Sequence, residues 1–474
     1  MLARHKNIVG GKTMNTRYQF TYCADVVVCG GGVAGCMAAM AAADEGKSVA
    51  VIEQFGQVGG SATAGLVTPL MPMFMEAKEP QKGDPCCSYL SEELNARMIK
   101  EGGAACYGRF FDPMTMRIIL EQMMVERGVK LFYHTFLCDA DVQNGVVKAV
   151  VVQNKSGRGY IEGKMFIDCT GDGDLGVLAG AGYRKGDEET GKNQPVSLRY
   201  LIGGVDIPAF DAFVREYFVK GQHNYWYDPE SGGLEVSITS HTYDKCPLTP
   251  VFLKAIENGD LIEDDLAYWQ MFYVAGRRDS VSLNNPEFFD HTDASNADDM
   301  TYIQVEGKKA ILRQLNFYQK YFKGFENAYL SEIADMVGVR ESRRLEADAM
   351  LTAEDIVSHR KFPDAICRNN YPVDIHGKKL RLVNQQENKD TAPYYEIPYG
   401  CLTVRGFENL LVAGRCVGSD FVAQSSLRIQ PICRALGEAA GIGAAMACEE
   451  GKAAREIDGS AIREKMIGRG ARFE

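Results

Sequence analysis

A glycine-rich turn near the N-terminus restricts the possible folds more than any other segment. Residues 24–29 (ADVVVC) form a short, continuous apolar run, which is typical of a buried parallel strand. Gly30, Gly32 and Gly35 follow at once in the pattern G-x-G-x-x-G and open an alanine-rich segment with helical character. Residues 48–53 (SVAVIE) predict the next strand. Strand, glycine turn, helix and strand make one βαβ unit with parallel strands.

The spacing of the three glycines suits a dinucleotide. Gly30 would allow the tight turn, Gly32 would let the backbone approach a pyrophosphate, and Gly35 would let the helix pack closely on the sheet. The backbone N–H groups of Val33 and Ala34 would then face the phosphates at the positive end of the helix dipole. An ordinary glycine turn is the alternative.

An acidic residue and a second glycine-rich stretch follow the βαβ unit. Glu53 ends the second strand, where its side chain can accept hydrogen bonds from ribose hydroxyls. Residues 59–65 (GGSATAG) suit a chain that runs along an extended flavin, whereas a plain NAD domain would continue into its next helix. The candidate cofactor contacts in this part are Glu53, Gln54, Gly60, Ser61, Ala62 and Thr63.

A similar segment lies near the C-terminus. Residues 409–431 (NLLVAGRCVGSDFVAQSSLRIQP) lead into a long glycine-rich helix predicted from Pro431 to Gly451. A helix N-terminus aimed at flavin N1 and C2=O would stabilise the negative charge of a reduced flavin, and Arg428 lies beside it. An arginine that bonds loop carbonyls is the alternative. The candidate contacts here are Gly414, Asp420, Arg428 and Gln430.

Together these segments resemble the FAD-dependent oxidoreductases whose flavin domain is of the glutathione-reductase/fumarate-reductase type. The resemblance runs from about residue 22 to 450 and also includes FIDCTGDGDLGVLAGA and GVRESRRLEADAMLTAEDI. It implies FAD as the cofactor and specifies no substrate. The expected fold is α/β, with a doubly wound, Rossmann-like FAD domain that is discontinuous in the sequence.

The pattern changes in the middle of the chain. From about 196 to 330, strand-like pieces alternate with helices rich in aromatic and charged residues, which predicts an inserted, largely antiparallel α+β substrate domain. Residues 331–357 predict a helix, a break and a strand. The expected organisation is a polar tail (1–21), the FAD domain in two parts (22–195 and 331–465) and the substrate domain (196–330).

Residues 171–176 (GDGDLG) repeat the G-x-G-x-x-G pattern after a strand. A separate NAD(P)H domain would need a following strand with a charged end, and the next segment contains none. The resemblance instead implies that Gly171 and Asp172 contact the adenosine side or the diphosphate of FAD. Capping of a short helix by Asp172 or Asp174 is compatible with that role.

Several classes of protein are disfavoured. Residues 55–65 contain no cysteine, unlike disulfide reductases of this fold. The 14 cysteines and seven histidines show no metal or disulfide spacing, so we expect free thiols, no metal and a cytoplasmic location. A net charge of −11 without a basic block disfavours nucleic acid. We expect no secretory signal and no membrane span, since no apolar run reaches ~18–20 residues.

Candidates for substrate chemistry lie between the two flavin segments. Asp374 and His376 place a titratable imidazole beside a carboxylate, as a general base near neutral pH requires, although a surface-loop histidine fits equally well. Arg340 could contact substrate, as could the Tyr399 hydroxyl, for which core packing is the alternative. Weaker candidates are Arg343 and Arg344 (internal ion pairs), Gln194 (flavin edge), and His223, His241 and His291 (ligands or surface residues).

The expected activity is hydride transfer between a small-molecule substrate and flavin N5, with His376 taking or giving the proton. The electron partner stays open between oxygen, a quinone, a protein and NAD(P), and a homo-oligomer is compatible with the sequence. Two alternatives remain: an NAD(P)H-linked flavin reductase with two dinucleotide sites, and an electron-transfer flavoprotein subunit of a larger complex.

Overall fold

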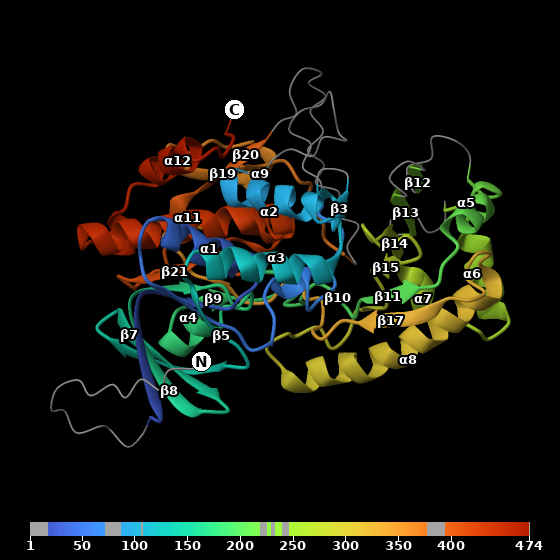
Figure 1. Ribbon diagram of the computed structural model, residues 1–474, viewed down its shortest axis with the longest axis horizontal. Helices are drawn as coiled ribbons and strands as arrows, with labels where there is room; N and C mark the ends of the chain where they lie inside the picture. Colours follow the sequence, from blue (N-terminus) through green and yellow to red (C-terminus); the bar gives the residue numbers. More distant parts are fainter. Residues whose placement is uncertain are drawn as a thin grey trace.

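Two sheets organise the structure, and they lie side by side in the longest dimension of the molecule (Figure 1). The computed structural model describes residues 18–71, 87–105, 108–218, 225–228, 233–238, 246–376 and 394–473.

The first sheet has a parallel, Rossmann-like core. Strand β1 (Phe20–Cys29) pairs with β2 (Val49–Ile52) on one side and with β8 (Gly157–Asp168) on the other, both in parallel. The parallel order continues to β5 (Lys130–Phe132) beyond β2 and to β21 (Leu410–Val412) beyond β8. The last four residues of β1 are buried, as the apolar run predicts, and the mixed α/β class is confirmed. Strand β1 begins at Phe20, two residues before residue 22, where the FAD domain was expected to begin.

An antiparallel extension completes this sheet. Strands β6 (Phe136–Gln143) and β7 (Val146–Asn154) form a hairpin, and β7 pairs with the first half of β8. The turn residues Asn144 and Gly145 have φ of 51° and 75°, so the predicted Asn-Gly hairpin is confirmed.

Helices from both ends of the chain meet on one side of the first sheet. Helices α1 (Val33–Asp44) and α11 (Gln430–Glu450) pack against each other along their length (Figure 1). A Cβ atom at Gly437 would lie 2.1 Å from the carbonyl oxygen of Ala34, and one at Gly441 would lie 2.2 Å from that of Ala38. The two helix backbones are therefore in direct contact, and only glycine fits at these two positions of α11.

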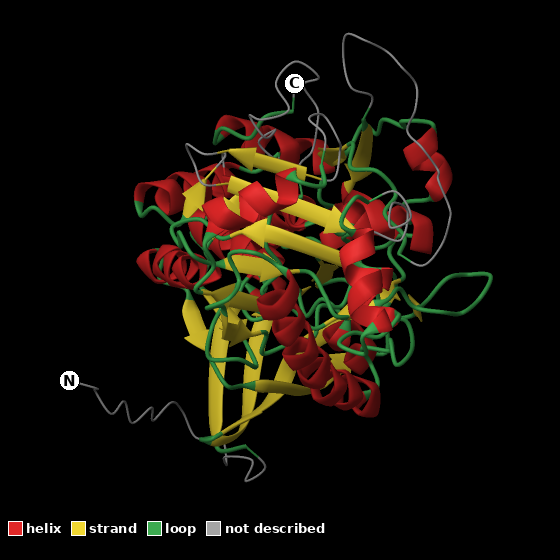
Figure 2. Cartoon of the chain, turned by 90° about the vertical axis from the view of Figure 1, so that its right-hand side faces the viewer, coloured by secondary structure: helices red, strands yellow, loops and turns green. Residues whose placement is uncertain are grey.

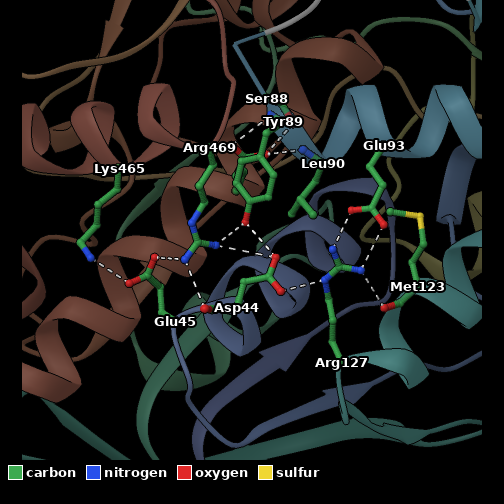
Figure 3. Close-up of polar contacts among 11 residues, drawn as sticks. Asp44, Glu45, Ser88, Tyr89, Leu90, Glu93, Met123, Arg127, Lys465 and Arg469 are labelled. Carbon is green, nitrogen blue, oxygen red and sulfur yellow. Dashed lines mark hydrogen bonds and ion pairs between the residues drawn. The ribbon is translucent and has the colours of Figure 1, made fainter.

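Three more helices surround this pair: α2 (Tyr89–Lys100), α3 (Pro113–Glu126) and α12 (Gly459–Gly468). Asp112 caps α3 and Pro113 occupies its first turn, as predicted. Ionic contacts tie the end of α1 to its neighbours (Figure 3). Arg127 lies 2.9 Å from Asp44, Lys465 lies 2.9 Å from Glu45, and Arg469 also pairs with Glu45.

The second sheet is antiparallel in every pairing and has its own apolar core. Figure 2 shows the molecule from the side that carries this sheet. Its strands, in spatial order, are β12 (Tyr225–Asp228), β13 (Gly233–Ile238), β14 (Trp269–Tyr273), β15 (Val281–Leu283), β11 (Tyr200–Gly203) and β17 (Tyr329–Ile333). Its helices are α5 (Ile207–Arg215), α6 (Thr249–Glu257), α7 (Asp264–Ala267) and α8 (Ala297–Tyr321).

The remaining described elements are short. The short strands are β3 (Ala104–Ala105), β4 (Phe110–Phe111), β9 (Tyr183–Arg184), β10 (Val196–Ser197), β16 (Glu287–Phe288), β18 (Arg344–Leu345), β19 (Ala365–Asn369) and β20 (Tyr395–Pro398). The short helices are α4 (Asp174–Ala179), α9 (Ala353–Val357) and α10 (Phe421–Leu427), with 3-10 turns η1 (Gly60–Ala62), η4 (Tyr399–Cys401) and η5 (Ala454–Glu456). Within the ranges described above, no helix is both long and apolar enough to cross a membrane.

The predicted order for residues 331–357 is wrong. The segment begins as the end of β17, contains the short strand β18 between two loops and ends in helix α9. Gly338 exchanges two backbone hydrogen bonds with Ser197, at 2.7 and 3.1 Å, and this pairing replaces the internal bonds that a helix would need.

The contact between α1 and α11 predicts a specific sensitivity. Gly441→Ala places a methyl group against the Ala38 carbonyl, so we expect a loss of about 1–3 kcal/mol in the free energy of unfolding. Urea denaturation measures it. Gly468→Ala in α12 is the control, because a Cβ atom there meets nothing within 4 Å. Equal stability of Gly441→Ala and the wild type would show that the backbones are not in contact.

Candidate active site

A cavity of about 390 Å³ lies at the carboxyl ends of β1, β2, β8 and β21. Its walls include residues from 29–34, 52–55, 169–171 and 413–415, each of which directly follows or ends one of these strands. The crevice beyond the carboxyl ends of parallel strands is where doubly wound sheets bind ligands. We call it the glycine cavity.

Two long helices begin at the glycine cavity. Val33 and Ala34 of α1, and Gln430 and Cys433 of α11, line it. Neither helix has a side-chain cap at its N-terminus. Free backbone N–H groups and two positive helix ends therefore face the cavity, which suits an anionic or electron-rich ligand.

The glycines of the first turn serve different purposes. Gly30 has φ of +97°, and a Cβ atom there would lie 2.4 Å from the carbonyl oxygen of Cys169, so the fold itself requires glycine. A Cβ atom at Gly35 would lie 1.9 Å from the Gly30 carbonyl oxygen. Gly32 differs, because its φ of −66° suits any residue and a Cβ atom would meet nothing closer than Gly60 Cα at 4.0 Å. Glycine at position 32 thus keeps space open in the cavity, as a bound pyrophosphate would require.

Glu53 lies at the wall of this cavity and is only 6 % exposed. Its carboxylate accepts hydrogen bonds from the backbone N–H groups of Gly31 (2.7 Å) and Phe55 (2.8 Å). Burial raises the pKa of Glu53, although both hydrogen bonds act in the opposite direction. Each carboxylate oxygen keeps acceptor capacity, so the contacts with the turn and a contact with ribose are compatible.

Most of the predicted cofactor residues line the glycine cavity. They are Gly30, Gly32, Val33, Ala34, Glu53, Gln54, Gly60, Ser61, Gly171, Gly414, Arg428 and Gln430. Five others lie outside its lining: Gly35, Ala62, Thr63, Asp172 and Asp420.

Local hydrogen bonding explains three of these exceptions. Thr63 donates its hydroxyl to the Val58 carbonyl at 2.6 Å. Asp172 pairs with Arg415 at 3.0 Å. Asp420 caps helix α10, where its carboxylate accepts the N–H of Ala423 at 2.7 Å.

A second cavity of about 220 Å³ adjoins the first. We call it the histidine cavity because His376 lines it, together with Asp374 and Arg340. The residues that line both cavities are Ser61, Val339, Arg415, Arg428 and Gln430. Six further polar residues of its wall belong to no sequence motif: Ser197, Arg199, Tyr268, Gln270, Asn284 and Tyr371.

His376 lies between two carboxylates. Its Nδ1 is 2.7 Å from Glu287 Oε1 and its Nε2 is 3.6 Å from Asp374 Oδ1. Arg340 reaches the same Glu287 oxygen at 2.9 Å. Burial and Arg340 lower the pKa of His376, but Glu287 and Asp374 outweigh them and raise it above its ordinary value. The sequence indicated Asp374 by its spacing, whereas Glu287 is far away in the chain.

The two carboxylates are held in their charged form. Burial raises the pKa of Glu287, but His376 and Arg340 outweigh it, so the pKa is lowered. The pKa of Asp374 is likewise lowered, against burial, by His376, Arg428 and Arg340. Arg428 donates to Asp374 Oδ2 and to the Asp374 carbonyl, at 3.0 Å each, so it is both a carbonyl-binding arginine and part of the cavity wall.

Most of the other candidate residues that the structure describes lie outside both cavities. Tyr399 is buried, donates its hydroxyl to the Ala454 carbonyl at 3.1 Å and lines neither cavity, which favours core packing, the alternative considered for it. Arg344 pairs with buried Glu341, and His291 pairs with Asp299 at the surface. Gln194 is buried outside both linings. Arg343 pairs with Asp174 at the wall of the glycine cavity, and His223 and His241 lie outside the described residues.

The second glycine motif does not open a second βαβ unit. Helix α4 follows it, but the next strand, β9, pairs antiparallel with β18 and lies outside the parallel sheet. Gly171 lines the same cavity as the first motif. The capping expected from Asp172 or Asp174 is wrong, because Gly173 occupies the N-cap and Thr170 Oγ1 accepts the N–H of Asp174 at 2.9 Å.

The raised pKa of His376 predicts how stability depends on pH. A group with a raised pKa in the folded state contributes stability that is complete below its unfolded pKa, 6.5 for histidine, and is lost as pH rises through the folded value. The difference in the free energy of unfolding between the wild type and His376→Gln should therefore shrink above about pH 6.5. Urea denaturation from about pH 6 to about pH 9 measures it.

His291→Gln at the surface is the matched control for loss of an imidazole. A wild-type advantage over His376→Gln that stays constant across this range would contradict the geometry with Glu287 and Asp374.

Comparison with solved structures yields distant likenesses. A geranylgeranyl bacteriochlorophyll reductase-like protein from Thermoplasma acidophilum is 13 % identical, with a TM-score of 0.42 over 94 % of this chain and 83 % of that chain. The myxobacterial chondrochloren halogenase CndH is 11 % identical, with a TM-score of 0.45 over 94 % and 79 %. L-Proline dehydrogenase from P. horikoshii is 11 % identical, with a TM-score of 0.41 over 94 % and 99 %.

Among curated proteins, no significant sequence match was found. A family model described as FAD-dependent oxidoreductase matches residues 25–466, and the resemblance indicated by the glycine segments is thereby confirmed. Because this match spans nearly the whole chain, the protein belongs to the FAD-dependent oxidoreductase family and is an enzyme with FAD as its cofactor.

Proposed function

We propose that this enzyme transfers a hydride between a small-molecule substrate in the histidine cavity and N5 of FAD in the glycine cavity. The observation that carries the proposal is the common wall of the two cavities, to which Ser61, Arg428 and Gln430 belong. A ligand in each cavity would meet at this wall. Bound FAD supplies a two-electron acceptor or donor.

Different residues of the glycine cavity would hold different parts of an extended dinucleotide. The N-terminus of α1 would hold the pyrophosphate and Glu53 the ribose. Arg428, Gln430 and the N-terminus of α11 lie at the wall shared with the histidine cavity and would hold the flavin end. A positive helix end there favours the negative charge of a reduced flavin.

His376 is the acid/base candidate. Glu287 lies against Nδ1 and would hold a proton there, which leaves Nε2 to exchange a proton with a substrate hydroxyl, amine or carbon. The proposed substrate domain, residues 196–330, supplies Tyr268, whose ring lies 4.7 Å from the imidazole, as well as Glu287. The imidazole is thus restrained on several sides before any substrate binds.

The structural observations favour this proposal over an NAD(P)H-linked reductase with two dinucleotide sites. The second glycine motif contributes to the same cavity as the first, and the strand after it leaves the parallel sheet. A subunit that only carries electrons would not need a second cavity lined by an imidazole between two carboxylates.

Gly32→Val tests the glycine cavity with little cost to the fold, since position 32 has an ordinary φ and open space around its Cβ. The side chain would occupy the place of the pyrophosphate. We expect folded protein that is poor in FAD, measured from the ratio of visible to ultraviolet absorbance together with circular dichroism. Gly468→Val, outside both cavities, should keep FAD. Normal FAD content in Gly32→Val would place the cofactor elsewhere.

His376→Ala tests the acid/base role. We expect the variant to keep FAD and to be reduced by its substrate about 10²–10⁴-fold more slowly, with a flatter pH profile near neutrality. Anaerobic stopped-flow absorbance measures the rate, with the substrate taken from a panel of hydroxy, amino and unsaturated acids, sugars and glycosides. Tyr399→Phe loses one core hydrogen bond and should keep the wild-type rate. Reduction of His376→Ala at the wild-type rate across pH would exclude the role.

A further inference from the structure

Arg199 is a buried cation at the wall of the histidine cavity. It lies between strands β10 and β11 and is only 2 % exposed. One guanidinium nitrogen, Nη2, donates to the carbonyl oxygen of Thr68 at 2.5 Å, and the group lies 5.9 Å from the ring of Phe272. Its Nε is buried and meets no hydrogen-bond acceptor among the described residues.

The other arginines of this cavity each have a carboxylate. Arg340 pairs with Glu287, Arg428 with Asp374, and Arg415 with Asp172. In the part of the chain that the structure describes, no carboxylate lies within 4 Å of Arg199. Among the described residues, the four guanidinium groups of this wall therefore meet three carboxylates, which leaves an excess of one positive charge when His376 is neutral.

The environment of Arg199 makes this excess unusual. Burial lowers the pKa of Arg199 to about 9, and the neighbouring Arg340 acts in the same direction, yet the group stays charged at neutral pH. Buried charges are ordinarily paired, because an unpaired charge loses its hydration and gains nothing in return. Three uncharged polar side chains line the same cavity and bond to one another: Asn284 donates to Gln270 at 2.9 Å and to the Tyr268 hydroxyl at 3.1 Å.

We propose that the substrate is a small carboxylic acid whose carboxylate pairs with the guanidinium of Arg199 in the histidine cavity. Naming this ligand as the substrate depends on the proposed function, whereas the anion site itself does not. A guanidinium matches a carboxylate with two parallel N–H···O bonds. A carboxylate carries the single charge that is missing, whereas a phosphate ester would bring more charge into a cavity of about 220 Å³.

The same cavity wall holds the acid/base candidate, so the anchor also determines which carbons of the acid are presented. A carboxylate at Arg199 leaves the carbons next to it within the cavity that His376 and Arg428 line. The substrates expected are therefore acids that carry a hydroxyl, an amine or a double bond close to the carboxylate.

The test is a binding titration of the purified, FAD-loaded enzyme that needs no turnover. Acetate, propionate and benzoate are compared with acetamide, propionamide and benzamide, which have a similar shape and no charge. Changes in the flavin absorbance and isothermal titration calorimetry report the dissociation constants. We expect the acids to bind about tenfold or more tightly than the amides, and Arg199→Met to remove this preference while amide binding stays unchanged.

Arg313→Met is the matched control, because it removes an arginine from the same half of the molecule, where Arg313 pairs with Asp265 outside both cavities. Arg199→Lys keeps the charge and should keep part of the preference. If Arg199→Met yields no folded protein, the comparison of acids with amides in the wild type and in Arg199→Lys decides.

Three results would overturn the anion site: equal binding of acids and amides, acid binding that is unchanged in folded Arg199→Met, and no binding of any acid. Tighter binding of inorganic phosphate than of acetate would overturn the carboxylate assignment. If acids bind through Arg199 but no compound reduces the flavin, the proposed hydride transfer fails and the anion site stands. If only neutral compounds reduce the flavin, and Arg199→Met is as fast as the wild type, the anion site fails and the proposed hydride transfer stands.

Discussion

The backbone contact between α1 and α11 is the constraint on which the rest of the structure depends. Gly437 and Gly441 carry no side chain at the points where the Ala34 and Ala38 carbonyls approach, so the two helices run together from a common end. That end is the glycine cavity, where both helices begin. Segments about 400 residues apart in the chain thereby converge on one cavity, and larger side chains at these glycines would separate them.

The histidine cavity depends on a different principle, the compensation of buried charge. Glu287 joins Arg340 and His376, and Asp374 joins His376 and Arg428, so most charges of the wall have a partner of opposite sign. Because Glu287 comes from the segment that carries the second sheet and Asp374 from the segment after it, the ion pairs also join the two halves of the molecule. Such a network positions the imidazole through its charged neighbours, and it makes Arg199, which has no carboxylate partner among the described residues, stand out.

Features that depend on neighbours in the sequence could be predicted. The βαβ unit, the Asn-Gly hairpin, the cap of α3 and the acidic residue after β2 all follow from residues within a few positions of one another. Most of the flavin candidates line the cavity for the same reason: each follows a strand, and parallel strands end at one edge of a sheet. His376 and Asp374 are two residues apart and were identified by that spacing.

Features that depend on partners far away in the sequence could not be predicted. Glu287 and Arg199 lie in segments without any local motif, and only the fold brings them to the histidine cavity. Tyr399 and Asp420 line neither cavity, because one residue type serves several purposes: a tyrosine hydroxyl can reach a core carbonyl, and an aspartate can cap a helix. In place of the helix expected after residue 331, Gly338 pairs with Ser197, and no local sequence pattern indicates this pairing.

The most direct measurement of the central claim is a crystal structure of the enzyme with FAD bound. We expect the pyrophosphate at the backbone N–H groups that begin α1 and the isoalloxazine ring at the wall formed by Ser61, Arg428 and Gln430, open toward His376. FAD bound at another edge of the sheet, or a ring turned away from the histidine cavity, would contradict the claim.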